Sequence, residues 1–398
     1  MAGYDVIIVG AGIPGLYLAR ELTRVGRNVL IMDSSPTPGE PNYSTAAIPV
    51  ETLDEFDLPR QGVGTSITRL LLGTSSNEFV KEAHACIAYV LDFKNTKSLL
   101  AEQIRELGGE VRWGWTASKL VEGKSKYSGV EINPTAQAEV CRNGNGTEVI
   151  TADIIVDASG TTGKLATQAN IRVKEPDRIS IGQEYIIRSK GNALQKFDQT
   201  LALYFGNDLA PHGYAWVFAN GNNTYKIGLM EHWIDPRRRL DSIHHRLDRF
   251  LYWIGKEKIG ETLETHGGAK YLSTNFPKVH QRNILAVGDA IGSVNPLFME
   301  GIRHGLYSAE FALKGIVTNN LNLYSARWKR YKGWRWRIVT KIARRTYNTA
   351  PQEFFEECIN FTNKNFSTID IIDIGFNYRF ERGWKHPIGA LRILRKWA

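Results

Sequence analysis

A glycine-rich turn near the N-terminus constrains the fold of this 398-residue chain more than any other feature. Gly10, Gly12 and Gly15 have the spacing G-x-G-x-x-G. They follow a short apolar run over residues 5–9 and precede an amphipathic stretch over residues 16–25. In that context the first glycine permits a tight turn, the second lets the backbone approach a pyrophosphate, and the third allows close helix–strand packing. Because the positive end of the helix dipole would face the phosphates, the pattern predicts a strand–turn–helix unit that binds a dinucleotide.

A second apolar run, over residues 28–32, ends at a carboxylate. This residue, Asp33, lies about twenty residues after the turn, where an acceptor for a ribose hydroxyl is expected. A carboxylate there favours an unphosphorylated ribose, so it indicates FAD or NAD rather than NADP at this site. Ser34 follows it, and Ile13 and Pro14 open the helix after the turn. We expect these three residues to contact the dinucleotide as well.

A second glycine motif, in residues 283–306, decides between these two cofactors. It reads NILAVGDAIGSVNPLFMEGIRHGL, so that a buried strand runs into Gly288-Asp289 and a helix follows Pro296. This segment resembles the FAD-dependent oxidoreductases with the p-hydroxybenzoate hydroxylase type of fold. The resemblance implies that Asp289 contacts the ribityl and pyrophosphate region of FAD. It also implies that the helix directs its N-terminus at the N1–C2=O edge, where its dipole would stabilise the reduced flavin. The residues that it implies for FAD binding here are Gly288, Asp289, Pro296, Gly301 and Ile302.

Between the two glycine motifs the periodicity becomes strand-like. Apolar runs recur at hairpin spacing, which is typical of an antiparallel sheet, over residues 183–188, 200–205, 214–218 and 225–230. Helical periodicity dominates beyond Asn319. We therefore predict an α/β protein (α+β overall), with a doubly wound, Rossmann-like FAD-binding domain, an inserted antiparallel β-sheet substrate domain and a helical C-terminal region. The expected boundaries are 1–170 and 282–325 for the FAD-binding domain, 171–281 for the substrate domain, joined by parts of 45–92, and 326–398 for the basic C-terminal region.

The chain also resembles the geranylgeranyl reductase family, over about residues 5–330. The segments that carry this resemblance are AIP at 47–49 with EFDLP at 55–59, GYAWVF at 213–218, and NPLFMEGI at 295–302. The W-x-W-x-I-P motif of flavin halogenases is absent from the sequence. One departure concerns residues 41–46, because the reductases carry a Lys-Pro-Cys-Gly-Gly stretch where this chain has PNYSTA. If that cysteine assists the chemistry in the family, this chain lacks the step or uses Ser44, Thr45 or Tyr43.

The resemblance implies the reduction of isoprenoid carbon–carbon double bonds in a lipid or prenyl-chain substrate, by hydride from reduced FAD. NADPH or a reduced ferredoxin would supply the electrons. Tyr214, Trp216 and Phe218 alternate along one predicted strand, so their rings share one side of the sheet. They are expected to line the substrate site, with ordinary core packing as an equal alternative. The sequence selects no proton donor and no metal site, and the candidates for the donor are Tyr214, Glu300, His304 and Ser44.

Three other functions fit the same fold. The first is a flavin-dependent monooxygenase of a hydrophobic substrate, which would consume O₂ and NAD(P)H in step with product. The second is a redox-neutral carotenoid cyclase, in which the reduced flavin acts as an acid or an electrostatic stabiliser. The third is a non-catalytic FAD-binding assembly subunit, an interpretation that the missing cysteine favours.

The net charge of +9 is concentrated in one stretch of the C-terminal region. Residues 327–352 contain no acidic side chain, and their basic side chains equal the whole excess: Arg327, Lys329, Arg330, Lys332, Arg335, Arg337, Lys341, Arg344 and Arg345. Apolar and aromatic residues recur among them at helical spacing, namely Trp328, Tyr331, Trp334, Ile338 and Ile342. This pattern indicates a basic amphipathic helix that contacts an anionic membrane surface through residues 327–345, although its aromatic face could instead pack on the protein. Nucleic acid is not expected, because no nucleic-acid-binding module is found elsewhere.

The compartment follows from three further observations. No run approaches the ~18 consecutive apolar residues of a membrane-spanning helix, and the N-terminus shows no secretory signal. Cys86, Cys141 and Cys358 are widely spaced and odd in number, which argues against a disulfide framework and suits a reducing compartment. We therefore expect a cytoplasmic, peripherally membrane-associated protein, with a membrane protein or an electron donor as a further candidate partner.

Overall fold

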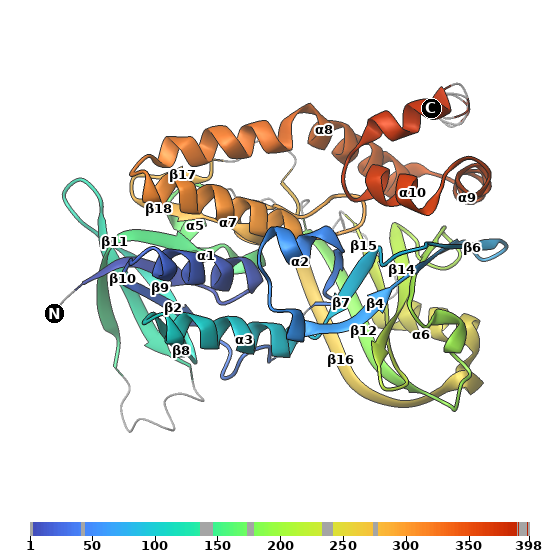
Figure 1. Ribbon diagram of the computed structural model, residues 1–398, viewed down its shortest axis with the longest axis horizontal. Coiled ribbons are helices and arrows are strands. Elements are labelled where there is room, and N and C mark those ends of the chain that lie inside the picture. Colours follow the sequence, from blue (N-terminus) through green and yellow to red (C-terminus); the bar gives the residue numbers. More distant parts are fainter. Residues whose placement is uncertain are drawn as a thin grey trace.

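The structure, a computed structural model, describes residues 3–40, 44–135, 146–172, 179–232, 242–273, 278–387, 389 and 396. Within these ranges two large sheets lie side by side (Figure 1). Helices cover the first sheet, and the C-terminal helices run along the top of the molecule in this view.

The first sheet is the doubly wound sheet that the N-terminal glycine motif predicted, and it is parallel except at β17 and at the added hairpin. Its strand order is β17-β18-β11-β1-β2-β8, and β1 pairs in parallel with both β2 and β11. Residues 6–9 are buried because helices cover the sheet, which explains their continuous apolar run. The strands are β1 (Tyr4–Val9), β2 (Val29–Asp33), β8 (Glu110–Trp113), β11 (Glu148–Asp157), β17 (His280–Gln281) and β18 (Ile284–Ala286), and the hairpin of β9 (Trp115–Glu122) and β10 (Tyr127–Pro134) adds to β11.

Three helices position the chemistry at the ends of these strands. They are α1 (Ile13–Arg24), α3 (Phe93–Glu106) and α7 (Ile302–Val317), and α1 packs against the other two. Asp92 is the N-cap of α3, because its Oδ1 accepts a hydrogen bond from Asn95 N–H at 3.0 Å. The short helix α5 (Lys164–Gln168) follows β11.

The second sheet contains the predicted antiparallel strands and two strands from earlier in the chain. Its order is β16-β12-β15-β14-β13-β5-β6. The pairing of β13 with β5 is parallel, which hairpin spacing did not predict. Helix α6 (Ile243–Gly255) covers one face, where Tyr204 and Ala202 of β13 pack, while Leu201 and Leu203 point to the opposite face. The strands are β5 (Arg69–Gly73), β6 (Glu78–Glu82), β12 (Ile179–Ser189), β13 (Thr200–Phe205), β14 (Gly213–Gly221), β15 (Thr224–Glu231) and β16 (Ile259–Tyr271).

A small third sheet links the two halves. It is formed by β3 (Ala47–Pro49), β4 (Val63–Ile67) and β7 (Ala88–Leu91), and α2 (Glu51–Glu55) follows β3. Its strands contact both α7 and β14. The whole arrangement confirms the predicted fold class, a Rossmann-like sheet with a separate, mostly antiparallel sheet and C-terminal helices.

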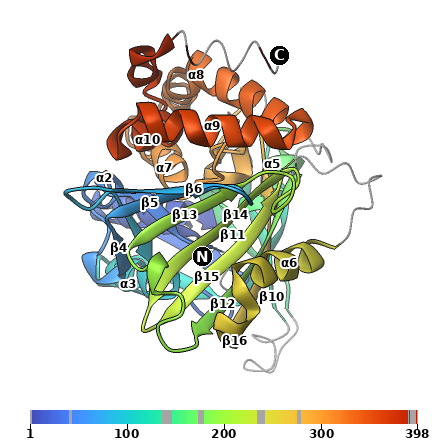
Figure 2. The ribbon, with the colours of Figure 1, turned by 90° about the vertical axis from the view of Figure 1, so that its right-hand side faces the viewer.

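The C-terminal helices are α8 (Leu321–Thr349), α9 (Gln352–Asn365) and α10 (Thr368–Gly375), and they lie over the second sheet in the rotated view (Figure 2). The expected single amphipathic face does not form, because Gly333 breaks α8 with φ +46° and ψ −158°. Before the break Trp328 is 1% exposed. After it, the exposed fractions are 59% for Trp334, 40% for Ile338 and 39% for Ile342.

Lys332 explains why the first half of α8 faces inward. Its Nζ donates a hydrogen bond to Gly292 O at 2.7 Å and lies 3.8 Å from the ring centre of Trp336. Burial lowers the pKa of Lys332 well below its usual range. One of the nine predicted surface cations is therefore part of the protein interior.

Two further observations bear on the sequence expectations. Among the described helices, none has the length and apolarity that crossing a bilayer requires. Cys86 and Cys358 are free thiols, and Cys141 lies outside the described residues.

We expect the stability of the protein to decrease in acid, because a buried histidine lies where α8 packs against the second sheet. His232, after β15, stacks on Tyr347 of α8 with ring centroids 4.2 Å apart and an interplanar angle of 6°. Burial lowers the pKa of His232 from 6.5 to about 3. Because the unfolded chain binds this proton near pH 6.5, the free energy of unfolding should fall as the pH is lowered from about 6.5 towards 3.

We expect His232→Phe to reduce this slope by up to about 1.4 kcal/mol per pH unit, measured by denaturant unfolding at several pH values. The matched control is His84→Phe, because His84 is exposed and should leave the slope unchanged. Equal slopes for wild type and His232→Phe would contradict the assignment.

Candidate active site

The three glycines of the first turn differ in how much space a side chain would have at each position. Gly10 has φ +108°, and a Cβ there would lie 2.3 Å from Ala158 O. A Cβ on Gly15 would lie 2.2 Å from Gly10 O. A Cβ on Gly12, the N-cap of α1, would meet nothing nearer than Pro14 Cδ at 3.9 Å. Gly10 and Gly15 are therefore required by the turn itself, whereas Gly12 leaves the space in front of the helix open.

Asp33 is fixed beside this turn at the end of β2. Its Oδ2 accepts a hydrogen bond from Ala11 N–H at 2.6 Å, and its Oδ1 accepts one from Ser35 N–H at 2.8 Å. Each carboxylate oxygen keeps a lone pair that can accept a ribose hydroxyl. Ser34 follows on the surface.

The second glycine motif lies against the first, although the two are far apart in the sequence. Gly288 and Asp289 form a 3₁₀ turn directly after β18. A Cβ on Gly288 would lie 3.6 Å from Pro14 Cγ, so a methyl group there would touch the first turn and the two turns lie close together. Helix α7 begins at Ile302, with Gly301 as its N-cap residue. The N-termini of α1 and α7 therefore open to the same region.

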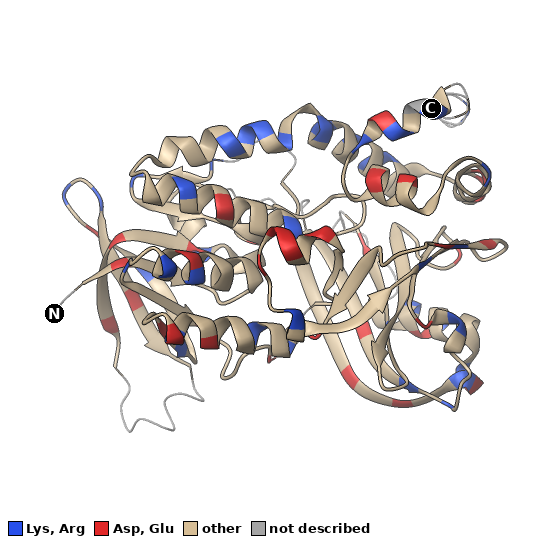
Figure 3. Cartoon of the chain, in the orientation of Figure 1, with Lys and Arg blue, Asp and Glu red and all other residues tan. Residues whose placement is uncertain are grey.

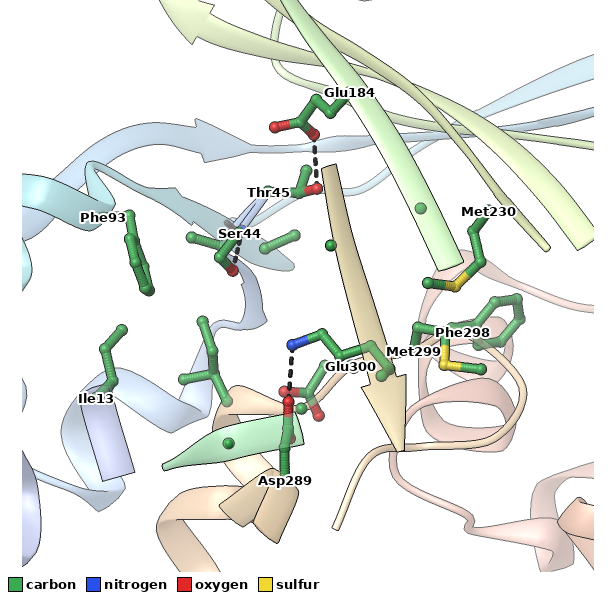
Figure 4. A pocket seen from close by; sticks show the side chains of 18 of the residues that line it. Ile13, Ser44, Thr45, Phe93, Glu184, Met230, Asp289, Phe298, Met299 and Glu300 are labelled. Carbon is green, nitrogen blue, oxygen red and sulfur yellow. Dashed lines mark hydrogen bonds and ion pairs between the residues drawn. The ribbon is translucent and has the colours of Figure 1, made fainter. Parts of the chain in front are cut away.

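A cavity of about 270 Å³ lies between these turns and the second sheet. Figure 4 shows side chains from both halves pointing into it. The residues from the half that contains the first sheet include Gly12, Ile13, Pro14, Ala158, Gly160, Val287, Gly288, Asp289, Glu300, Gly301 and Ile302. The apolar residues opposite them include Leu201, Leu203, Tyr214, Trp216, Phe218, Met230, Phe298 and Met299.

The three aromatic residues of β14 line the cavity from one side, as their alternation predicted. Tyr214 OH donates a hydrogen bond to Phe298 O at 2.6 Å, and burial raises its pKa. Trp216 Nε1 donates one to Glu184 Oε2 at 2.8 Å. Gly228 lies opposite Trp216 on β15, where a Cβ would be 2.1 Å from the indole ring. The polar atoms of these rings are thus bonded to the protein, and their apolar surfaces face the cavity.

The segment that replaces the family's cysteine stretch also reaches the cavity. Residues 41–43, including Tyr43, lie outside the described residues, while Ser44 and Thr45 line the cavity. Ser44 Oγ accepts a hydrogen bond from Ala46 N–H at 3.1 Å. Thr45 Oγ1 donates one to Glu184 Oε2 at 2.6 Å.

Glu300 lines the cavity as a buried carboxyl group. Its Oε1 accepts a hydrogen bond from Arg303 N–H at 2.7 Å, whereas its Oε2 has no hydrogen-bond partner within the described residues. Burial raises the pKa of Glu300, and the nearby Arg303 guanidinium opposes this shift without cancelling it. The group therefore tends to keep its proton.

Six predicted residues lie outside the cavity lining: His304 and Pro296, and, at the first glycine turn and the end of β2, Gly10, Gly15, Asp33 and Ser34. His304 is buried, with its Nδ1 2.6 Å from Tyr331 OH and its ring stacked on Tyr378. Its burial lowers its pKa, so the ring stays neutral. Pro296 is buried in the turn before α7, and residues 298–302 line the cavity in its place.

Sequence reasoning did not single out Lys270, Glu184 or Met230. Lys270, on β16, reaches across the cavity and places its Nζ 2.8 Å from Asp289 Oδ2, an ion pair drawn as a dashed line in Figure 4. The available signal was Gly267-Gly268 two residues earlier, because paired glycines in a strand often mark a close approach of another group.

These features fit FAD and give no indication of a metal. The open N-terminus of α1, the carboxylate at the end of β2 and the proximity of the two glycine turns are what a dinucleotide requires. Across the described ranges, no cluster of His, Cys, Asp and Glu is arranged to hold a metal ion.

Two family models match the chain. Residues 183–270 match the geranylgeranyl reductase catalytic domain, and residues 8–55 match an NAD(P)-binding Rossmann-like domain. The first match spans β12 to β16, which form the apolar wall, and the second contains the glycine turn and Asp33.

Two relatives are similar over most of their length. The chain is 25% identical over 362 residues to digeranylgeranylglycerophospholipid reductase of Haloferax volcanii, covering 87% of this chain and 85% of that protein. It is 27% identical over 343 residues to the protein of the same name from Methanocaldococcus jannaschii, covering 82% of each.

Solved structures share the fold. The geranylgeranyl bacteriochlorophyll reductase-like protein of Thermoplasma acidophilum superposes with a TM-score of 0.80 at 19% identity, covering 96% of this chain and 98% of that chain. The p-nitrophenol 4-monooxygenase of Pseudomonas putida superposes with a TM-score of 0.68 at 14% identity, covering 91% and 94%. Together the comparisons confirm the predicted resemblance to the geranylgeranyl reductases and the class of FAD-dependent oxidoreductases.

The open space at Gly12 predicts that a larger side chain there removes the cofactor without preventing folding. We expect Gly12→Val to fold but to lose FAD, because its branched side chain would fill the space in front of α1. The flavin content of the purified protein, measured by absorbance after denaturation, checks this. The matched control is Gly146→Val, since a Cβ on Gly146 meets nothing within 4 Å and the residue is remote from the cavity. A folded Gly12→Val protein with full flavin content would contradict the assignment.

Proposed function

We propose that this FAD-dependent oxidoreductase reduces carbon–carbon double bonds in the prenyl chains of a lipid. The observation that carries the proposal is the apolar wall formed by Leu201, Leu203, Trp216 and Met230, which faces the two glycine turns across one cavity. This wall belongs to the segment that matches the geranylgeranyl reductase catalytic domain. The names of the two relatives supply the substrate class, a phospholipid with geranylgeranyl chains.

The cavity suits a prenyl chain because much of its lining is apolar and the polar atoms of Tyr214, Trp216 and Thr45 are hydrogen-bonded to the protein. Each methylene that leaves water for such a lining contributes about 0.8 kcal/mol to binding. A second, smaller apolar cavity shares Ala47, Leu201 and Phe376 with the main one and continues to Ile372 on α10. We infer that the chain extends from the flavin site towards α10.

The reaction needs a hydride and a proton. Bound FAD, once reduced, supplies the hydride, and the protein must orient the double bond, exclude water and hold the proton. Tyr214 OH is already bonded to Phe298 O, and His304 does not line the cavity. Glu300 lines it, has a pKa that burial raises, and has one oxygen without a hydrogen bond within the described residues. We therefore infer that Glu300 holds the proton.

The test is anaerobic incubation of the dithionite-reduced protein with geranylgeranyl lipids, followed by mass spectrometry. We expect each saturated bond to add the mass of two hydrogen atoms. Addition of oxygen under air would indicate a monooxygenase, unchanged mass with altered retention a cyclase, and no change at all an assembly subunit. Supplying NADPH or reduced ferredoxin in place of dithionite then identifies the electron donor.

The same assay tests Glu300. We expect Glu300→Gln to keep its flavin and to lower the rate by about 10²-fold, because it removes the proton without changing the shape. The wild-type rate should fall as the pH rises through the raised pKa of Glu300, and the variant should lose that limb. Glu110→Gln, a change at a site remote from the cavity, is the control.

We also propose that the enzyme meets its lipid at an anionic membrane surface through the second half of α8. The docking face consists of Trp334, Ile338 and Ile342, which lie at intervals of four residues and are exposed. Exposed basic side chains flank them, namely Arg335, Arg337, Lys341, Arg344 and Arg345. Figure 3 shows Lys and Arg along α8. Interfacial rings with flanking cations are typical of a helix that lies on a membrane.

Binding to anionic liposomes should be strong at low salt and weak at high salt. Each cation near the lipid contributes roughly 1 kcal/mol, and salt screens that attraction. We expect Arg337→Gln with Lys341→Gln, and separately Trp334→Ser, to reduce co-sedimentation. Lys332 is left unchanged because it is buried. The matched control is Lys119→Gln with Lys124→Gln, two exposed lysines near the β9–β10 hairpin. The proposal would be contradicted if the wild-type protein did not bind anionic liposomes at low salt, or if the Arg337→Gln, Lys341→Gln variant bound them as well as the wild type.

A further inference from the structure

Lys270 is the one lysine or arginine among the described residues that line the cavity. It comes from β16 of the second sheet, and its partner Asp289 comes from the FAD-binding half. The two side chains are 30% and 15% exposed, and the Nζ–Oδ2 distance is 2.8 Å. A single positive charge is therefore held at the boundary between the two halves of the site.

This charge lies next to the start of α7. A Cβ on Gly301, the N-cap residue of α7, would be 3.2 Å from Asp289 Oδ1. The carboxylate that pairs with Lys270 thus lies close to the N-terminus of α7. The positive end of the α7 dipole and the Lys270 ammonium group act on the same region of the cavity.

The other ionisable groups in the lining do not replace this charge. Burial raises the pKa of Glu300 and so favours its neutral form. His266, four residues before Lys270 on β16, has its Nε2 3.1 Å from Glu264 Oε2. Arg172 and Lys332 interact electrostatically with Asp289, but neither of them lines the cavity. Without Lys270, no cation in the described lining would face Asp289.

We propose that Lys270 stabilises the negative charge of the reduced flavin and thereby raises the reduction potential of the bound FAD. Two-electron reduction with uptake of one proton leaves one negative charge on the flavin, and no covalent bond to the protein forms or breaks. In a cavity of low dielectric, a cation nearby favours that charge, whereas Asp289 alone would oppose it. The inference rests on the FAD assignment, and not on the identity of the substrate.

The test is the midpoint potential of FAD in the intact holoenzyme, measured by equilibration with a reference dye under anaerobic reduction. We expect Lys270→Met to lower the equilibrium constant for two-electron reduction about tenfold, which corresponds to about 30 mV. Sulfite, which adds to the flavin and leaves a negative charge on it, should bind about tenfold more weakly. Lys270→Arg should keep both values near wild type, and Lys124→Met, an exposed lysine, is the control.

A second variant separates charge from structure. Adding Asp289→Asn to Lys270→Met removes the unbalanced carboxylate, so the potential should return towards wild type at saturating FAD. An unchanged potential in FAD-loaded Lys270→Met would overturn the proposal. Loss of FAD from both Lys270→Met and Lys270→Gln at saturating FAD would also overturn it, because Lys270 would then anchor the cofactor. Failure to reduce prenyl lipids leaves these measurements unaffected, so the two proposals fail separately.

Discussion

The candidate site depends on how closely the backbone approaches itself at the carboxyl end of the first sheet. A Cβ on Gly15 would lie 2.2 Å from Gly10 O, and one on Gly305 would lie 2.6 Å from Pro14 Cγ. The first approach lets α1 begin directly above β1, and the second lets α7 pack against the start of α1. Because neither leaves room for a side chain, two helix N-termini open into one cavity. The assignment of FAD and of the residues around it follows from this packing.

The cavity opposite these turns contains few charged groups, and most of them are compensated. Glu184 accepts hydrogen bonds from Thr45 and Trp216, and Asp289 pairs with Lys270. A buried charge without a partner would cost several kcal/mol and would attract water. A lipid chain in the proposed site would therefore meet no isolated charge, because burial favours the neutral form of Glu300.

Much of this arrangement could be predicted because its signals are local. The glycine spacing at residues 10–15, Asp33 after an apolar run, and the alternation of rings over 214–218 each need only a short segment to be recognised. The pairs Lys270–Asp289 and Thr45–Glu184 could not be predicted, since each joins segments whose proximity depends on sheet register. The prediction of one continuous face on α8 from Trp328 to Ile342 was wrong for a related reason, whereas contact of the helix with a membrane stays a prediction. Its period was correct, but the burial of Lys332 depends on a carbonyl group near the second glycine turn.

Gly333 separates a buried first half of α8 from a second half that carries exposed apolar side chains. On one side, Lys332 is bonded to the backbone just beyond the cofactor turn; on the other, Trp334 is exposed to solvent. The backbone angles at Gly333, φ +46° and ψ −158°, are closed to residues with a Cβ. Position 333 therefore accepts almost no other amino acid, although it contacts neither cofactor nor lipid in either proposal. A substitution of Gly333 would impair folding or membrane binding. The cause would be a change in one pair of backbone angles, which set the direction of the exposed second half of α8 relative to its buried first half.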